Sequence, residues 1–270
     1  MAAHPLLQAK GITKTFPGVL ALDSVDFDLY PGEVHVLLGE NVAGKSTLMK
    51  VLAGAYQPDS GAIRLDGEQV RVANPRHAQR LGVGIIYQEF NLVPYMSVAQ
   101  NIFLGRFPHR WGLLDQATMR AESRKLLDGL NMDIDPRAKV VTLGVAQQQM
   151  VEVAKALAVQ SKILIMDEPT AALTDREIEQ LFATIHRLKQ QDIGIIYISH
   201  RLQEVHQIGD RVTVLRDGKF IGNRQVSQVT VDELIAMMVG RTITHTRYRS
   251  MWKGPVDGYA ASFTVSWGLS

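Results

Sequence analysis

Several features are missing from this sequence of 270 residues, and each absence excludes a class of protein. There is no cysteine, which excludes disulfides and thiolate metal sites and fits a reducing cytoplasm. Lys and Arg total 29 against 27 Asp and Glu, so the net charge of +2 gives no basic field for nucleic acid. No stretch reaches the roughly 18 uncharged apolar residues of a spanning helix, and the first residues lack a signal-peptide pattern. We therefore expect a chain that folds in water, binds no nucleic acid, and reaches any membrane through partners.

Short β-like runs alternate with helical patterns along most of the chain. This alternation indicates an α/β domain with a largely parallel sheet. Residues 250–270 show no periodicity and are predicted to be a poorly ordered end, with an edge strand as the alternative. The predicted strands cover 8–16, 23–29, 34–38, 62–72 (a hairpin turning at Asp66-Gly67), 162–169, 194–200 and 210–222. The predicted helices cover 46–54, much of 91–160, 174–188, 201–208 and 231–240.

The strongest motif lies between the strand at 34–38 and the helix at 46–54. Its residues, Gly39-Glu-Asn-Val-Ala-Gly44-Lys45-Ser46, fit the phosphate-binding pattern G-x-x-x-x-G-K-[ST]. Backbone N–H groups and the helix N-terminus favour phosphate, Lys45 adds a positive charge, and the Ser46 hydroxyl suits Mg²⁺. An accidental glycine turn is the alternative, but the flanking strand and helix argue against it. The predicted nucleotide-binding residues here are Gly39, Glu40, Asn41, Val42, Ala43, Gly44, Lys45, Ser46 and Thr47.

A second motif is the apolar run at 163–166 that ends in Asp167 and Glu168. A buried parallel strand delivers such residues to its carboxyl end, where ligands bind in sheets of this kind. Asp167 is then placed to hold Mg²⁺ through water, and Glu168 to act as a general base on the attacking water. Alone, such a pair is more often a solvated helix cap, but the phosphate loop favours the catalytic interpretation.

In this order the motifs resemble the nucleotide-binding subunits of ABC transporters. The likeness is specifically to the first cassette of ribose, galactose, arabinose and xylose importers, over about residues 6–243. It implies a RecA-like P-loop NTPase core, an N-terminal antiparallel β subdomain, and a helical subdomain at about 91–160 that carries the signature motif. It also implies ATP and Mg²⁺ as ligands, and leaves 244–270 as a tail.

The resemblance assigns roles to three further residues. Phe16 takes the place of the aromatic that stacks on adenine, although a core phenylalanine is the alternative. Gln88 corresponds to the glutamine that reaches the metal and the attacking water and links the site to the membrane subunits; taken alone it is unremarkable. His200 matches the switch histidine at the γ-phosphate, against the alternative of a structural histidine.

Two elements depart from the family pattern. The signature, which caps the phosphate bound by an opposite cassette, has Gly144 and Ala146 where Ser and a second Gly are common, so we expect a weaker contact in trans. Val42 replaces a usual Gly, and a β-branched residue at a position of positive φ is strained, so we expect reduced nucleotide affinity. The predicted signature residues are Leu143, Gly144, Val145, Ala146 and Gln147.

The function expected from this resemblance is ATP hydrolysis that drives monosaccharide uptake at the cytoplasmic face of the inner membrane. The expected partners are transmembrane permease subunits, a second cassette and, indirectly, an extracytoplasmic sugar-binding protein. A cassette ATPase of translation or DNA repair would predict long basic arms or a coiled-coil insertion, and neither is evident. A truncated or non-hydrolysing product stays open, because related subunits hold two cassettes and this chain stops after the first.

Overall fold

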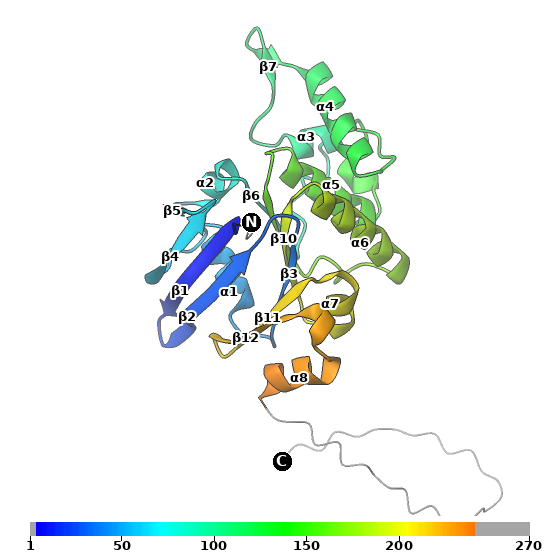
Figure 1. Ribbon diagram of the computed structural model, residues 1–270. Coiled ribbons are helices and arrows are strands. Elements are labelled where there is room, and N and C mark those ends of the chain that lie inside the picture. Colours follow the sequence, from blue (N-terminus) through cyan, green and yellow to red (C-terminus); the bar gives the residue numbers. More distant parts are fainter. Residues whose placement is uncertain (1–3, 241–270) are drawn as a thin grey trace, which may run out of the picture.

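A six-stranded sheet forms the centre of the computed structural model, which describes residues 4–240 (Figure 1). Its strand order is β12-β11-β3-β10-β9-β6, and all neighbours are parallel except β11 and β12. The predicted largely parallel sheet is therefore confirmed. The strands are β3 (Val34–Leu38), β6 (Val83–Ile86), β9 (Ile163–Asp167), β10 (Gly194–Ser199), β11 (Arg211–Arg216) and β12 (Lys219–Gln225).

A second, antiparallel sheet of four strands in the order β2-β1-β4-β5 stands beside the first. It supplies the N-terminal β-rich layer that the sequence predicts. The predicted hairpin turn is confirmed, since Asp66 and Gly67 both have positive φ, 49° and 86°. The strands are β1 (Leu7–Phe16), β2 (Val19–Leu29), β4 (Ser60–Leu65) and β5 (Glu68–Val70).

The helices occupy three places around the sheets (Figure 1). Helix α1 (Lys45–Leu52) packs between the two sheets, and the short α2 (Pro75–Arg80) contacts β6. Helices α3 (Val98–Ile102), α4 (Gln116–Gly129) and α5 (Val145–Leu157) contact one another in the segment expected to be helical. The others are α6 (Asp175–Gln190), α7 (Leu202–Ile208) and α8 (Val231–Val239), with short 3₁₀ turns at Val140–Thr142 and Val226–Gln228.

One small element in the helical segment was not expected. Strands β7 (His109–Arg110) and β8 (Leu113–Leu114) pair as a hairpin whose turn residues, Trp111 and Gly112, have φ of 57° and 78°. Only two residues of each strand pair, which is too short for a period-2 pattern to be visible in the sequence.

Alternation along the central strands builds two hydrophobic cores, one on each face of the sheet. In β3, Val34, Val36 and Leu38 join the core beneath the α5–α8 layer, while Leu37 joins the core around α1. Because strands buried on both faces cannot slip in register without exposing apolar side chains, their carboxyl ends are fixed along one edge. That edge carries the loops after β3, β9 and β10.

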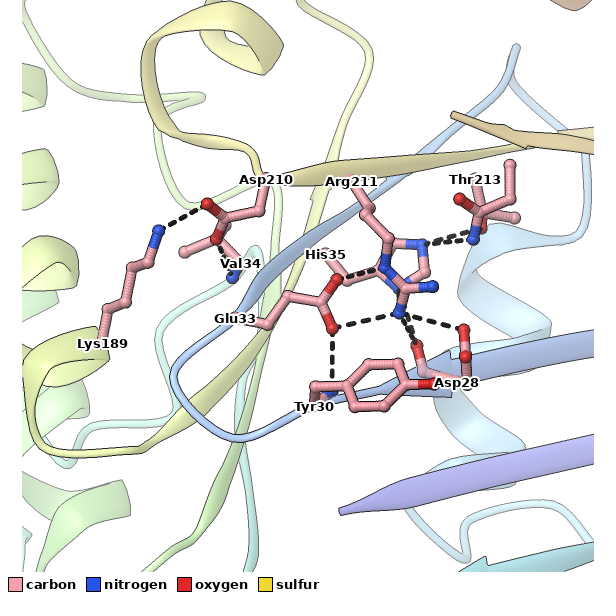
Figure 2. Close-up of polar contacts among 10 residues, drawn as sticks. Asp28, Tyr30, Glu33, Val34, His35, Lys189, Asp210, Arg211 and Thr213 are labelled. Carbon is pink, nitrogen blue, oxygen red and sulfur yellow. Dashed lines mark hydrogen bonds and ion pairs between the residues drawn. The ribbon is translucent and has the colours of Figure 1, made fainter. Parts of the chain in front are cut away.

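The opposite end of β3 is held by a dense polar cluster (Figure 2). Arg211 donates to both carboxylate oxygens of Glu33 and lies 3.1 Å from the Asp28 carboxylate. His35 is fully buried, with Nδ1 2.6 Å from the carbonyl oxygen of Asp28 and Nε2 2.8 Å from the hydroxyl of Thr213. A carbonyl only accepts, so Nδ1 carries a proton, and the lowered pKa of the ring leaves it neutral. Burial and, next, Arg211 lower the pKa of His35 to about 3.

Among residues 4–240, no helix is both long and apolar enough to cross a bilayer. The tail predicted for 244–270 lies outside the described residues.

Candidate active site

The loop from Gly39 to Gly44 joins β3 to α1 and depends on its two terminal glycines. A Cβ on Gly39 would lie 2.5 Å from the carbonyl oxygen of Leu215, closer than any side chain tolerates. Gly44 has φ of 98°, and its Cβ would lie 2.8 Å from the carbonyl oxygen of Ala21. These contacts explain why glycine brackets the bend. The first N–H groups of α1 follow directly and have no partner within the helix, as at any helix N-terminus.

Lys45 is folded against this loop. Its Nζ donates to the carbonyl oxygens of Gly39 at 2.6 Å and Glu40 at 2.9 Å, and the residue is buried. Burial lowers the pKa of Lys45, while the carboxylates of Glu168 and Asp167 act in the opposite direction. The ammonium group therefore lies within the electrostatic reach of both acids.

Asp167 ends β9, and Glu168 begins the loop that follows it. Burial and the neighbouring Glu168 raise the pKa of Asp167, and the charges of Lys45 and Lys50 partly offset this. Glu168 has φ of 46°, and its Oε1 lies 3.0 Å from Nδ1 of His200. The helix-cap alternative for this pair is wrong, because α6 begins only at Asp175 and is capped by Thr174.

A single cleft of about 1020 Å³ gathers most of the predicted site. It is lined by the loop from Glu40 to Gly44, by Lys45, Ser46 and Thr47 of α1, and by Gln88, Asp167, Glu168 and His200. Residues that the sequence did not single out also line it: Val19, Leu20 and Ala21 of β2, Arg216, Asp217 and Gly218 at the β11–β12 turn, and Met238 of α8. No local pattern marks these residues, since only the packing of distant elements places them here.

The donor set at this cleft fits a magnesium ion. Ser46, Gln88 and Asp167 offer a hydroxyl, an amide and a carboxylate oxygen, the hard ligands that Mg²⁺ takes. No group of three His, Asp or Glu side chains able to hold a metal by itself occurs in residues 4–240.

Phe16 is not among the residues that line the cleft. Its ring is half-buried at the end of β1, edge-on to the ring of Tyr56 at 5.2 Å, with Nζ of Lys14 5.6 Å from its centre. Phe16 is therefore outside the fully buried core, and its role toward adenine stays a prediction.

The segment from Leu143 to Gln147 lies apart from the cleft of its own chain. Gly144 is exposed at the N-terminus of α5, and its N–H donates to Oε1 of Gln147 at 3.1 Å. The amide of Gln148 donates to the carbonyl of Leu143 at 3.0 Å. The N–H of Gly144 thus already has a partner within the chain, and its role toward a phosphate stays a prediction.

A second groove, of about 720 Å³, shares a wall with the cleft. Ser46, Gln88 and Asp167 line both spaces. The far side of the groove belongs to the helical segment and includes Arg106 and Glu152. Nη2 of Arg106 donates to the carbonyls of Ile102 and Lys155, whereas Nη1 is buried with no hydrogen-bond partner in the described part of the chain.

Comparison with known proteins places this site in a family. Residues 22–171, more than half of the chain, match the family model described as ABC transporter, and the chain belongs to this family. It is 58% identical over 240 residues to the ribose import ATP-binding protein RbsA 1 of Rubrobacter xylanophilus, covering 89% of this chain and 48% of that protein. It is 54% identical over 250 residues to a putative ribose/galactose/methyl galactoside import ATP-binding protein of Burkholderia lata, covering 92% of this chain and 49% of that protein. The chain spans about half the length of the curated relatives it matches.

Solved structures show the same fold. A nucleotide-free ATP-binding cassette from an ABC transporter superposes with a TM-score of 0.76 at 24% identity, over 88% of this chain and 96% of that one. The dimeric structure of an ATP-binding cassette in a post-hydrolysis state, bound to ADP and Pi, superposes with a TM-score of 0.70 at 23% identity, over 82% of this chain and 98% of that one. The fold class predicted from the sequence is confirmed.

Proposed function

We propose that this chain hydrolyses ATP with magnesium as a cassette of an ABC importer and that a separate permease uses the free energy for monosaccharide uptake. One observation carries the proposal: a single cleft gathers the phosphate loop, Lys45, Asp167, Glu168 and His200. The relatives are named as sugar import ATP-binding proteins, which supports the choice of cargo.

The residues of the cleft supply each part of a phosphoryl transfer to water. Loop N–H groups and Lys45 bind the β- and γ-phosphates. Glu168 accepts a proton as the water oxygen bonds to the γ-phosphorus, and the bond from that phosphorus to the β–γ bridging oxygen breaks with its electron pair leaving on ADP. His200, held against Glu168, orients the base and contacts the γ-phosphate. Ser46, Gln88 and Asp167 would hold magnesium, and the bound ion would supply positive charge beside the phosphate oxygens.

A second cassette completes the site in this proposal. None of residues 143–147 lines the cleft of its own chain, and Gly144 and Val145 are exposed, which supports a contact with the nucleotide of an opposing subunit. The solved dimer of a related cassette supports such an arrangement. Gly144 lacks a hydroxyl, so we expect its contact with a phosphate to be weaker than that of a serine.

The permease is proposed to dock in the second groove. This groove borders Gln88 and Asp167 of the cleft, and its far side, which includes Arg106 and Lys155, belongs to the helical segment expected to couple to the permease. Docking there would hold the chain peripherally at the cytoplasmic face of the membrane. An external binding protein would act only through the permease.

The test is ATP hydrolysis by the purified chain, compared with Glu168→Gln. We expect magnesium-dependent turnover by the native chain and at least a hundredfold loss in the variant, because the amide cannot take the proton. Glu177→Gln, in the first turn of α6 and outside the cleft, keeps an oxygen that accepts from Thr174; it is the matched control and should retain activity. Equal rates for the native chain and Glu168→Gln would remove Glu168 as the base.

A hydrolysis-impaired cassette is the second candidate, and Val42 favours it. Its φ of 71° places a β-branched residue in the left-handed region, and its side chain is 95% exposed at the mouth of the cleft. An ATP affinity that does not change in Val42→Gly, measured by calorimetry, would count against this candidate.

A further inference from the structure

The loops that carry Glu168 and His200 meet behind the cleft at one buried carboxylate. Glu204 lies in the first turn of α7, is 4% exposed, and accepts three hydroxyl hydrogen bonds. Thr170 donates to its Oε1 at 2.6 Å, and Tyr197 and Ser199 donate to its Oε2 at 2.9 and 2.7 Å. These three side chains are themselves at most 2% exposed.

Two of the three donors lie next to different catalytic residues along the chain. Thr170 is two residues after Glu168, and Ser199 immediately precedes His200. The same two segments also meet on the side that faces the cleft, where Nδ1 of His200 lies 3.0 Å from Oε1 of Glu168. Only this pair faces the cleft, because Glu204 is absent from the residues that line it.

We call the contact of Glu204 with Thr170, Tyr197 and Ser199 the junction. Its three hydroxyl donors require an acceptor with several lone pairs. An ionised carboxylate accepts without donating and has room for about four hydrogen bonds, so it satisfies three hydroxyl donors at once. Arg201, with Nη1 3.6 Å from Oε1, supplies a positive charge beside it. Hydrogen bonds to a charged group are stronger than neutral ones, so the junction is stiff.

The backbone of Glu168 shows why stiffness matters there. Its φ of 46° is unfavourable for a residue with a side chain, and such a conformation persists only where the surroundings hold it. The N–H of Glu168 donates to the carbonyl of Ile198, and Thr170 anchors the next turn of the loop to Glu204.

We infer that Glu204 is a positioning residue that fixes the Glu168 loop against the His200 loop, so that the base and the histidine keep one relative geometry. This inference rests on the hydrolytic role proposed above for Glu168. Glu204 itself does not contact the substrate; it acts through Thr170 and Ser199.

The test uses the full chain and replacements at the donors, which leave Glu204 in place. Thr170→Val removes the hydroxyl but keeps the shape, whereas Thr170→Ser keeps the hydroxyl. Thr184→Val is the control for loss of a buried hydroxyl, since Thr184 is 1% exposed and donates to the carbonyl of Gln180 within α6. We expect kcat for ATP to fall about tenfold in Thr170→Val with KM within about twofold, and both constants to stay near native in the other two variants.

A second measurement does not depend on hydrolysis. Amide hydrogen exchange should show that a replacement in one loop loosens the other loop. Thr170→Val should speed exchange about tenfold at the amide of Arg201, whose N–H donates to the hydroxyl of Ser199. Ser199→Ala should speed exchange about tenfold at the amide of Glu168, whose N–H donates to the carbonyl of Ile198. Amides of β3 should stay unchanged. If each replacement loosens only its own loop, or if Thr170→Val and Thr170→Ser behave alike, the inference is wrong. A native chain without ATPase activity would instead contradict the proposed function, and the exchange experiment would still decide the role of Glu204.

Discussion

The two ends of β3 hold charges in opposite ways. At the amino end, Arg211, Glu33 and Asp28 are paired with one another, and His35 is neutral with both ring nitrogens hydrogen-bonded (Figure 2). At the carboxyl edge of the sheet, where Lys45 follows β3 and Asp167 ends β9, Asp167 and Glu168 adjoin one another, and burial works against the charge of Lys45. At the amino end, the charged groups are paired with one another within the chain. At the carboxyl edge, burial disfavours the charges of Lys45 and Asp167, and a bound phosphate and cation would neutralise them. The difference separates a cluster built for stability from one built for binding.

The largest expected effect is on the paired end. Arg211→Ala leaves the carboxylates of Glu33 and Asp28 without their cation, and removal of one partner from a buried ion pair costs about 3 kcal/mol or more. We expect that loss in the free energy of unfolding measured with urea. Arg224→Ala, at an exposed position of β12, is the control and should cost less than about 0.5 kcal/mol. Similar small losses for both variants would mean that the cluster contributes little.

A substitution at the phosphate-binding end should lower the affinity for ATP and leave the free energy of unfolding nearly unchanged. Lys45→Ala removes the charge directed at the phosphates, so we expect affinity for ATP to fall about a hundredfold, measured by calorimetry. The free energy of unfolding should change by less than about 1 kcal/mol, because burial already opposes this charge. Lys219→Ala, exposed at the start of β12, should alter neither quantity. A loss of stability equal to that of Arg211→Ala would erase the contrast between the two ends.

Strain in the phosphate loop can be released at Val42. Val42→Gly should raise the free energy of unfolding by about 1 kcal/mol, since glycine adopts a φ of 71° without penalty, and should tighten ATP binding. Val42→Ala keeps a Cβ and therefore serves as the matched variant, with a smaller gain in both quantities. If the alanine variant gains as much as the glycine variant, the β-branch rather than φ is the cause.

The smallest expected effect depends on pH. The pKa of Asp167 is raised in the folded chain, so its folded state binds the proton more tightly than the unfolded state does. Its contribution to stability is therefore greatest at low pH and is lost as pH rises through the raised pKa. Asp167→Asn should raise the melting temperature at pH 7.5, and the gain should shrink toward pH 4. A gain independent of pH would mean that ionisation of Asp167 is not its source.

The two ends also differ in how far the sequence predicts them. The binding end follows from local motifs, because the Gly39–Ser46 loop and the Asp167-Glu168 pair are contiguous and each follows an apolar strand. The amino end was not predicted at all. Its ion pair joins residues 178 apart in the chain, and no spacing rule connects Glu33 with Arg211.

Helices and strands were predictable where the sequence shows a hydrophobic repeat of 3.6 or 2 residues. Long amphipathic runs such as α6 and the buried strands β3 and β9 were found, and the predicted starts of α6 and α8 fall within one residue of the observed ones. The hairpin at 109–114 was missed because its strands are too short, and the lining of the cleft by Met238 and Arg216 depends on packing alone.

The wall that Gln88 and Asp167 share between the cleft and the groove has a thermodynamic consequence. Suppose that an occupant of one space shifts these side chains and thereby changes affinity in the other by some factor. Reciprocity then requires that the second occupant change the affinity of the first by the same factor. Titrating one ligand at fixed concentrations of the other would therefore measure communication across the wall from either side, and the two measurements must agree.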